Sequence, residues 1–568
     1  MFITLPKDYL QYRDWNWEQF KPYADDLVRR KITAENVLEW LTDWSDLSRV
    51  LSEMQCRLYV AITVDTTDKE SKDRYNAYLD GIYPQAQMLH QQCKEKLLAS
   101  GLEPEGMKMP ILHMRAEAEI YREANLPLLA EEFKLGSEYD ELIGAQTVEW
   151  DGKELTIAQL QPYYLLQDRT VRERVWRLGV ERQLADREKI NDLWKRFMQV
   201  REEITANTGL PDYRAFMWKT YPRYDYTPKD CYSFHAAIEQ EVVPVMRRIY
   251  ERRRQRLGVE TLRPWDKDVD VLGRNPLKPY QTARELEEKA AAIFHKVDPQ
   301  LGGYFDLMRR QGLLDLENRK GKAPGAYCIG FDSTRLPFMF ENAVGLHDDV
   351  ATVLHEAGHA FHAFESYPLP YHQQLTVGME IAEVASMAME LLASPYLTVD
   401  QGGYYSAKDA ARARIEHLES ALLFWPYMAV VDAFQHWVYE NHTTASQPAN
   451  CDAKWSELWE RFMAGVDYSG LEEHVCTGWQ RKGHIFQVPF YYVEYGLAQL
   501  GAFQVWRNAL QDQAGAVAAY RRALALGGTA PLPELYAAAG AKFAFDAETL
   551  GAMVRLAESV IAELEQVE

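Results

Sequence analysis

The sequence predicts a large, mainly α-helical protein with two lobes. Helical patterns of apolar and polar residues dominate the 568-residue chain from Trp15 onward. A chain of this length exceeds one typical hydrophobic core, so we expect at least two lobes. We place the boundary near residue 170, which gives an N-terminal helical lobe over residues 1–170 and a second lobe over residues 171–568. Joints between helices are expected where proline and glycine cluster, near residues 101–110, 205–228, 257–281, 321–337 and 525–534.

Only two short β elements are expected. Asp151-Gly152, a favoured dipeptide for two-residue turns, separates residues 147–150 from residues 153–156 and predicts a small hairpin. A second strand is predicted over residues 337–342, just ahead of the motif described next. It is either part of a plain hairpin or an edge that pairs with an extended peptide. The alanine-rich end from residue 514 to 564 predicts terminal helices.

The stretch His355-Glu356-Ala357-Gly358-His359 carries the strongest functional signal. Residues i and i+4 share a helix face, so His355 and His359 can offer ring nitrogens to one cation while Glu356 lies beside it. No proline occurs from residue 342 to 367, which places the motif inside a helix. Gly358 costs about 1 kcal/mol there relative to alanine, a cost that is tolerable if another chain segment or the metal must approach closely. The alternative is two buried structural histidines on an ordinary helix.

A catalytic zinc ion takes three protein ligands and keeps a fourth position for water, so a third ligand is needed. The longer zincin string, with a third histidine six residues on, is absent because that position holds Glu365. The apolar segment 378–392 carries Glu380, Glu383 and Glu390 at steps of three and seven, on one helical face. An acidic stripe on a surface helix is the other interpretation. Spacing alone does not choose between Glu380 and Glu383 as the ligand.

These residues resemble the thimet oligopeptidase and oligoendopeptidase F family of zinc metallopeptidases. In that family the motif is followed by a glutamate, then by a serine three places later and a second glutamate seven places later. Glu383, Ser386 and Glu390 reproduce this order, with Glu383 lying 24 residues past His359. The resemblance therefore selects Glu383 as the third zinc ligand. It also implies that Glu390 orients a ligand imidazole, a task that Glu380 would share. Two further stretches are similar to the family, residues 325–328 and 337–342.

The metal chemistry predicts hydrolysis. Zinc lowers the pKa of its bound water to about 7, and Glu356 is positioned to take the water proton and deliver it to the leaving amine. Donors should also face the oxygen on which negative charge develops. Residues 483–495 combine one histidine with three tyrosines, a composition that by itself is more typical of core packing.

The resemblance assigns this aromatic segment a catalytic role. It implies that His484 and Tyr495 donate hydrogen bonds to the substrate carbonyl, with Tyr491 and Tyr492 as alternatives. It also implies one Zn²⁺ per chain, enclosed in a deep channel between helical lobes that admits only short peptides. The predicted function is a zinc-dependent oligoendopeptidase that cleaves internal bonds of short peptides.

Two other functions remain open at this stage. A helical zinc metallocarboxypeptidase would need a cationic residue for the substrate carboxylate, and no sequence motif places one. A non-catalytic zinc-stabilised peptide-binding protein would have no use for a general base, so Glu356 argues against it.

Charge and composition limit the classes of molecule that the protein can bind. The 63 basic and 84 acidic residues give a net charge of −21, which opposes nucleic acid and anionic membranes as partners. No stretch reaches 18 uninterrupted apolar residues, and a charged pair at residues 7 and 8 precedes any secretory segment. The six cysteines form no Cys-x-x-Cys pair, so reduced thiols are expected. These features predict a cytoplasmic protein, and the sequence does not specify its oligomeric state.

Overall fold

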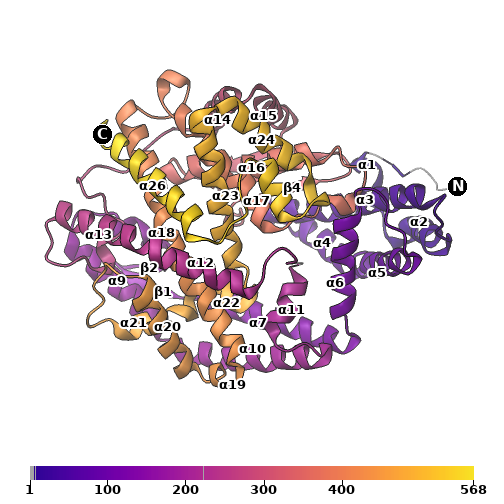
Figure 1. Cartoon of the computed structure of the whole chain (residues 1–568), viewed down its shortest axis with the longest axis horizontal. Helices are drawn as coiled ribbons and strands as arrows, with labels where there is room; N and C mark the ends of the chain where they lie inside the picture. Colours follow the sequence, from indigo (N-terminus) through magenta and orange to yellow (C-terminus); the bar gives the residue numbers. More distant parts are fainter. Residues whose placement is uncertain (1–4, 7, 222, 568) are drawn as a thin grey trace.

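The computed structural model describes residues 5, 6, 8–221 and 223–567. The chain is mainly helical and has two lobes, which confirms the predicted fold class. Helices of the first hundred residues gather at one end of the molecule, drawn in indigo at the right of Figure 1. They enclose a hydrophobic core of their own, built from residues between Leu5 and Met114 together with Tyr371. A larger core fills the rest of the described chain. The lobe boundary near residue 170 stays a prediction.

The helices of the first half are α1 (Tyr9–Tyr12), α2 (Trp17–Arg29), α3 (Val37–Val64), α4 (Lys69–Gly81), α5 (Tyr83–Ser100), α6 (Lys108–Ile120), α7 (Leu126–Gly144), α8 (Gln161–Tyr164), α9 (Arg169–Leu184), α10 (Arg187–Thr208), α11 (Tyr213–Thr220), α12 (Pro228–Glu241), α13 (Val243–Leu257), α14 (Ala283–Val297) and α15 (Pro299–Gln311).

The helices of the second half are α16 (His347–Ser366), α17 (Met379–Ala393), α18 (Ala407–Glu440), α19 (His442–Ala445), α20 (Pro448–Phe462), α21 (Glu472–Cys476), α22 (Gly483–Gln487), α23 (Tyr492–Gln511), α24 (Gln513–Ala525), α25 (Leu532–Ala538) and α26 (Ala547–Leu564). The last three confirm the terminal helices expected from the alanine-rich end. Across the described residues, none of the helices combines the length and the apolar character needed to cross a membrane.

The first hairpin occurs where the sequence predicts it. Strands β1 (Thr147–Trp150) and β2 (Lys153–Thr156) pair antiparallel around Asp151 and Gly152. Both turn residues have positive φ, 49° and 73°, as a two-residue hairpin turn with the right twist requires.

The second sheet corrects one interpretation of residues 337–342. Its strands are β3 (Leu314–Glu317), β4 (Tyr327–Phe331) and β5 (Leu336–Ala343), in the order β3-β5-β4. Residues 337–342 lie in β5, which pairs in parallel with β3 on one side and antiparallel with β4 on the other. The idea that this segment offers an edge to a peptide is therefore wrong, because both of its edges are occupied. The sheet packs beside α16, and β4 is an edge strand.

Helix α16 begins where a carboxylate collects the backbone N–H groups of the preceding turn. The Asp349 side chain accepts from the N–H groups of Val344, Gly345 and Leu346 at 2.8–2.9 Å, and Tyr280 donates its hydroxyl to the same carboxylate. These bonds satisfy donors that would otherwise lack partners at a helix start. They fix the direction in which α16 leaves β5.

Gly358 sets the distance between α16 and α17. A Cβ atom at this position would lie 2.4 Å from the carbonyl oxygen of Ala385 and 2.6 Å from the Cα of Ser386. Only glycine allows α17 to approach so closely, which confirms the close contact expected from a glycine inside a helix.

Candidate metal centre

Helices α16 and α17 bring two imidazoles and one carboxylate together. The Nε2 atom of His355 lies 3.4 Å from Oε2 of Glu383, and Nε2 of His359 lies 3.8 Å from the same oxygen. We call His355, His359 and Glu383 the metal cluster. Both imidazoles are partly exposed, while the glutamate is buried.

The donor set of the metal cluster fits zinc. Zinc binds imidazole nitrogen and carboxylate oxygen at about 2.0–2.2 Å, and atoms at the corners of such a tetrahedron lie about 3.3–3.6 Å apart. The two separations of 3.4 and 3.8 Å are close to this range. The three side chains could therefore hold one ion with little rearrangement.

A second layer of polar groups holds the metal cluster in place. Oε1 of Glu390 lies 2.7 Å from Nδ1 of His355, and its other oxygen lies 3.4 Å from Nδ1 of His417 on α18. Ser386 donates its hydroxyl to Oε2 of Glu383 at 2.9 Å. A carboxylate on the far nitrogen of a ligand histidine fixes its tautomer and ring orientation. His417 was missed by the sequence analysis, because no spacing relates it to the motif.

Glu356 is buried beside the metal cluster with an uncommitted oxygen. Among the described residues, its Oε2 has no hydrogen-bond partner. Burial raises the pKa of Glu356 to about 7, against the opposing effect of the neighbouring His355. Burial also raises the pKa of Glu341, on β5, to about 9, with the Asp349 and Glu356 carboxylates adding to the shift. The Cys328 thiol in the same region has a raised pKa through burial, as expected of a packing residue.

The aromatic segment 483–495 lies in helices α22 and α23 and the turn between them. The His484 ring centre is 5.0 Å from that of Tyr492, and 6.2 Å from those of Tyr491 and Tyr495. Helix α23 packs along α17. Burial and, more weakly, the charge of Glu383 raise the pKa values of Tyr491 and Tyr495, so both hydroxyls lie within electrostatic reach of the metal cluster.

The backbone just before these tyrosines adopts an uncommon conformation. Phe490 has φ of 68°, a left-handed value that costs a non-glycine residue about 1–3 kcal/mol. Its N–H donates to the Gln435 side chain at 2.8 Å, and its carbonyl accepts from the Arg223 guanidinium at 2.6 Å. These two buried contacts hold the turn that directly precedes Tyr491.

The hydrogen bonds of Glu380 go to residues outside the metal cluster. Its Oε1 accepts the Tyr226 hydroxyl at 2.7 Å, and its backbone carbonyl accepts the Tyr536 hydroxyl at 3.1 Å. The structure therefore brings together Glu383 and Glu390 with the histidines of α16, while the Glu380 carboxylate pairs with a tyrosine.

A second group of metal-type side chains is buried between α12 and α18. It consists of Cys231, His235, Asp432 and His436, which we call the buried histidine cluster. Nε2 of His235 lies 2.7 Å from Oδ2 of Asp432, and Nε2 of His436 lies 3.4 Å from it. The sequence analysis missed this group, although the spacing of four residues on each helix was a usable signal.

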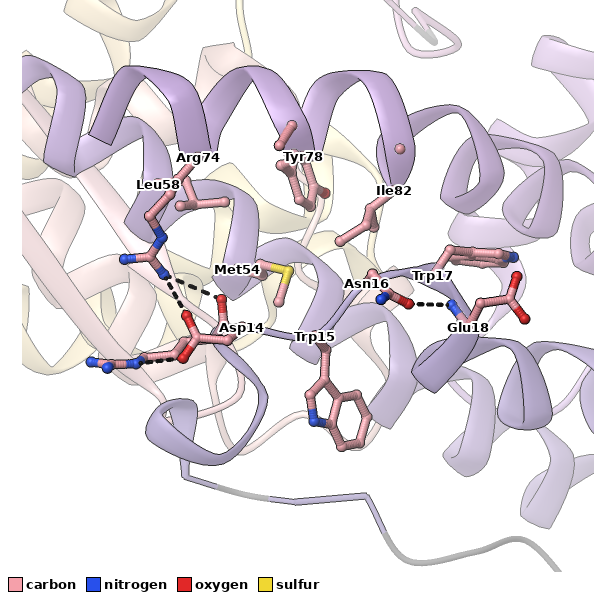
Figure 2. Close-up of a pocket in the computed structure, with 13 residues that line it drawn as sticks. Asp14, Trp15, Asn16, Trp17, Glu18, Met54, Leu58, Arg74, Tyr78 and Ile82 are labelled. Carbon is pink, nitrogen blue, oxygen red and sulfur yellow. Dashed lines mark hydrogen bonds and ion pairs between the residues drawn. The ribbon is translucent and has the colours of Figure 1, made fainter. Parts of the chain in front are cut away.

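A hollow of about 500 Å³ lies in the N-terminal lobe, between α2, α3 and α4 (Figure 2). Two of its polar side chains already have partners. Asp14 accepts from Arg74 at 3.2 Å, and Asn16 accepts from the backbone N–H of Glu18 at 2.9 Å. None of the metal-cluster residues lines it.

A His-Glu-x-x-His helix completed by a ligand from elsewhere in the chain is the arrangement typical of zincins, and α16 and α17 have this arrangement. The sequence profile described as peptidase family M3 matches residues 163–555, and the profile of the peptidase M3 N-terminal domain matches residues 8–109. The chain therefore belongs to peptidase family M3, which confirms the family indicated by the resemblance.

Solved structures of similar proteins cover the whole chain. PZ peptidase A, solved with an inhibitor, is 27% identical with a TM-score of 0.85 and covers 100% of this chain and 99% of its own. A candidate oligoendopeptidase F is 29% identical with a TM-score of 0.85, covering 99% and 98%.

Curated relatives match over shorter stretches. The oligoendopeptidase F homolog of Borreliella burgdorferi is 23% identical over 297 residues, which is 51% of this chain and 48% of that protein. An oligoendopeptidase F homolog of Lactococcus lactis is 28% identical over 148 residues, 26% of this chain and 24% of that protein. The matches thus span about half or less of these relatives.

Proposed function

We propose that the protein is a zinc-dependent oligoendopeptidase that hydrolyses internal bonds of short peptides, with one Zn²⁺ per chain. The observation that carries the proposal is the convergence of His355 Nε2, His359 Nε2 and Glu383 Oε2 beside a buried Glu356 with a free oxygen. Membership of family M3 and the likeness to PZ peptidase A support peptides as substrates. The cytoplasmic location inferred from the sequence belongs to the same proposal.

His355, His359 and Glu383 would hold the metal. When bound, zinc would supply Lewis acidity and a water molecule whose pKa is lowered to about 7. The Glu390 carboxylate keeps the proton of His355 on Nδ1, which leaves Nε2 free as a ligand atom.

Glu356 would act as the proton carrier. Its unpaired Oε2 takes a proton from the attacking water, and the same oxygen returns the proton to the amine nitrogen as the peptide bond breaks. A pKa raised to about 7 by burial suits both steps near neutral pH.

His484 and Tyr495 would donate hydrogen bonds to the carbonyl oxygen as negative charge builds on it. Burial and the Lys482 charge lower the pKa of His484 to about 4, so its imidazole is neutral and keeps one N–H donor. Tyr491 and Tyr492, which lie 5.2 and 5.7 Å from the Tyr495 ring, remain alternatives for the same role.

The decisive experiment is Glu356→Gln, assayed on an internally quenched peptide with both ends blocked. We expect turnover to fall by about 10²–10⁴-fold while zinc content stays at one per chain. Glu457→Gln, which changes an exposed glutamate of α20, serves as the matched control and should leave turnover unchanged. Unchanged turnover in Glu356→Gln would refute the catalytic role, and product mapping would separate internal from terminal cleavage.

A further inference from the structure

Lys482 is a half-buried cation that lacks an acidic partner. It lies in the connection to α22, two residues before His484, and its ammonium is 3.9 Å from the ring centre of Tyr492 and 5.4 Å from that of Tyr427. Within the part of the chain that the structure describes, no carboxylate lies within ion-pair distance of it. Burial lowers the pKa of Lys482 to about 8, and no neighbouring charge offsets that shift.

The absence of a paired acid stands out in an acidic chain. The protein has 84 acidic residues against 63 basic ones, yet the Lys482 ammonium has no ion-pair partner among the described residues. A partly buried cation has lost part of its hydration, and an incoming anion would offset that loss. The aromatic faces of Tyr427 and Tyr492 contact the Lys482 ammonium when no anion is bound.

Lys482 adjoins the candidate catalytic residues. The Tyr492 ring contacts both the Lys482 ammonium, at 3.9 Å, and the His484 ring, at 5.0 Å between centres. We propose that Lys482 forms a subsite that binds a carboxylate of the peptide substrate next to His484. The proposal rests on the function proposed above and names a substrate feature that the site recognises. It also supplies the cation that the sequence motifs did not reveal for a carboxypeptidase-like mode of binding.

The test compares matched peptides that differ in a single charge. One pair has the same sequence with a free C-terminal carboxylate or an amide, and the other pairs carry aspartate or asparagine on either side of the cleaved bond. We expect wild-type enzyme to prefer the carboxylate member of at least one pair by about 10- to 100-fold in kcat/KM, the value of a hydrogen bond to a charged group. The pair that carries the preference identifies whether an α-carboxylate or a side chain is bound.

Substitution of Lys482 should remove the preference. In Lys482→Gln and Lys482→Met the ratio should fall to within about threefold of one, while Lys482→Arg should retain most of it. Lys195→Gln, an exposed lysine on α10, is the matched control and should keep the full ratio. Thermal melting checks that each variant is folded. A ratio near one in every wild-type pair, or one that survives in Lys482→Gln and Lys482→Met, would overturn the proposal.

Binding measurements separate this proposal from the peptidase proposal. Dissociation constants of the same peptide pairs on Glu356→Gln give the charge preference without turnover. If wild-type enzyme cleaves none of the peptides but the preference appears in binding, the peptidase proposal fails and the carboxylate subsite stands. Equal binding of both members of every pair would refute the subsite.

Discussion

The metal cluster and the buried histidine cluster contain similar donors in a similar arrangement, yet they differ in what those donors can do. Each pairs two side chains four residues apart on one helix with groups from a neighbouring helix. The His355 and His359 side chains are 28% and 22% exposed, whereas those of His235 and His436 are 4% and 1% exposed. The first difference between the two clusters is therefore how accessible their imidazoles are to solvent and to a ligand.

The second difference is whether the lone pairs are already in use. Nδ1 of His436 lies 3.2 Å from the Arg214 guanidinium, which can only donate, so Nδ1 accepts and Nε2 carries the proton. Nε2 then carries the proton and lies 3.4 Å from Asp432 without a hydrogen bond among the described residues, so it offers no lone pair to a cation. In the metal cluster, Glu390 engages Nδ1 of His355 and leaves Nε2 for a ligand. The comparison teaches that the second contact of each imidazole, more than the donor type, decides between a metal site and a structural network.

The largest effect is expected from a substitution within the metal cluster itself. Glu383→Ala removes the oxygen that both imidazoles face, so we expect bound zinc and peptide turnover to fall to background. Asp432→Asn, the matched change in the buried histidine cluster, should retain zinc at the wild-type level. Metal analysis and a peptide assay on both variants check this. Zinc that persisted in Glu383→Ala, or that disappeared in Asp432→Asn, would contradict the comparison.

A change in the buried histidine cluster should cost stability and leave the metal in place. Asp432→Ala removes the hydrogen-bond partner of the buried His235 imidazole and the carboxylate that faces His436, and we expect the free energy of unfolding to fall by about 3–5 kcal/mol. Urea denaturation measures the loss. Asp192→Ala, at an exposed aspartate of α10, should change stability by less than about 0.5 kcal/mol. A loss at Asp432 no larger than this control would show that the network contributes little.

A smaller effect is expected from a substitution of Glu390, and it tests the role of the carboxylate that contacts His355. Glu390→Gln weakens the contact that fixes the imidazole, so we expect the zinc dissociation constant to rise about 10- to 100-fold. Glu380→Gln, whose carboxylate contacts Tyr226, should change that constant by less than about threefold. Competition with a chromophoric chelator gives both values. Equal effects of the two substitutions would mean that Glu380 shares the task, as the sequence resemblance implied.

The smallest expected effect is a pH dependence of stability from the buried histidine cluster. Burial lowers the pKa of His436 from its usual 6.5, while the His436 and His235 imidazoles hold the pKa of Asp432 below its usual value despite burial. Both groups bind fewer protons in the folded than in the unfolded state. Stability is therefore fully present above pH 6.5 and is lost as the pH falls below it, first through His436 and at lower pH through Asp432.

His436→Asn tests this sign. We expect the slope of the unfolding free energy between pH 6.5 and 5 to decrease by up to about 1.4 kcal/mol per pH unit, the value of one proton. Urea titrations at several pH values measure it. A slope identical to that of wild type would show that His436 binds the same number of protons in both states.

Local sequence patterns predicted those features of the structure that depend on residues close together in the chain. The helix around His355 and His359, the close approach at Gly358 and the turn at Asp151-Gly152 follow from spacing, side-chain size and backbone preference. The family, which the profile matches confirm, was indicated by residues within one stretch of the chain.

Contacts between distant segments could not be predicted in the same way. Glu380 and Glu383 differ by only about 60° around a helix, so spacing left them equivalent until the Tyr226 hydroxyl was found on Glu380. The place of β5 between two partners depends on β3, which a sequence pattern does not link to it. The contacts of His417 with Glu390 and of Lys482 with Tyr492 depend on packing between distant segments or on the local turn, which no spacing reveals. The roles of His484 and the three tyrosines rest on the resemblance and stay predictions.

The tight contact at Gly358 has a consequence for protein design. The general His-Glu-x-x-His pattern leaves its two middle positions unrestricted. Here a methyl group at the second of them would collide with the main chain of α17 at 2.4 Å. A designer who moves this site onto another scaffold must therefore transplant the crossing of both helices, and a library that varies position 358 will return only glycine.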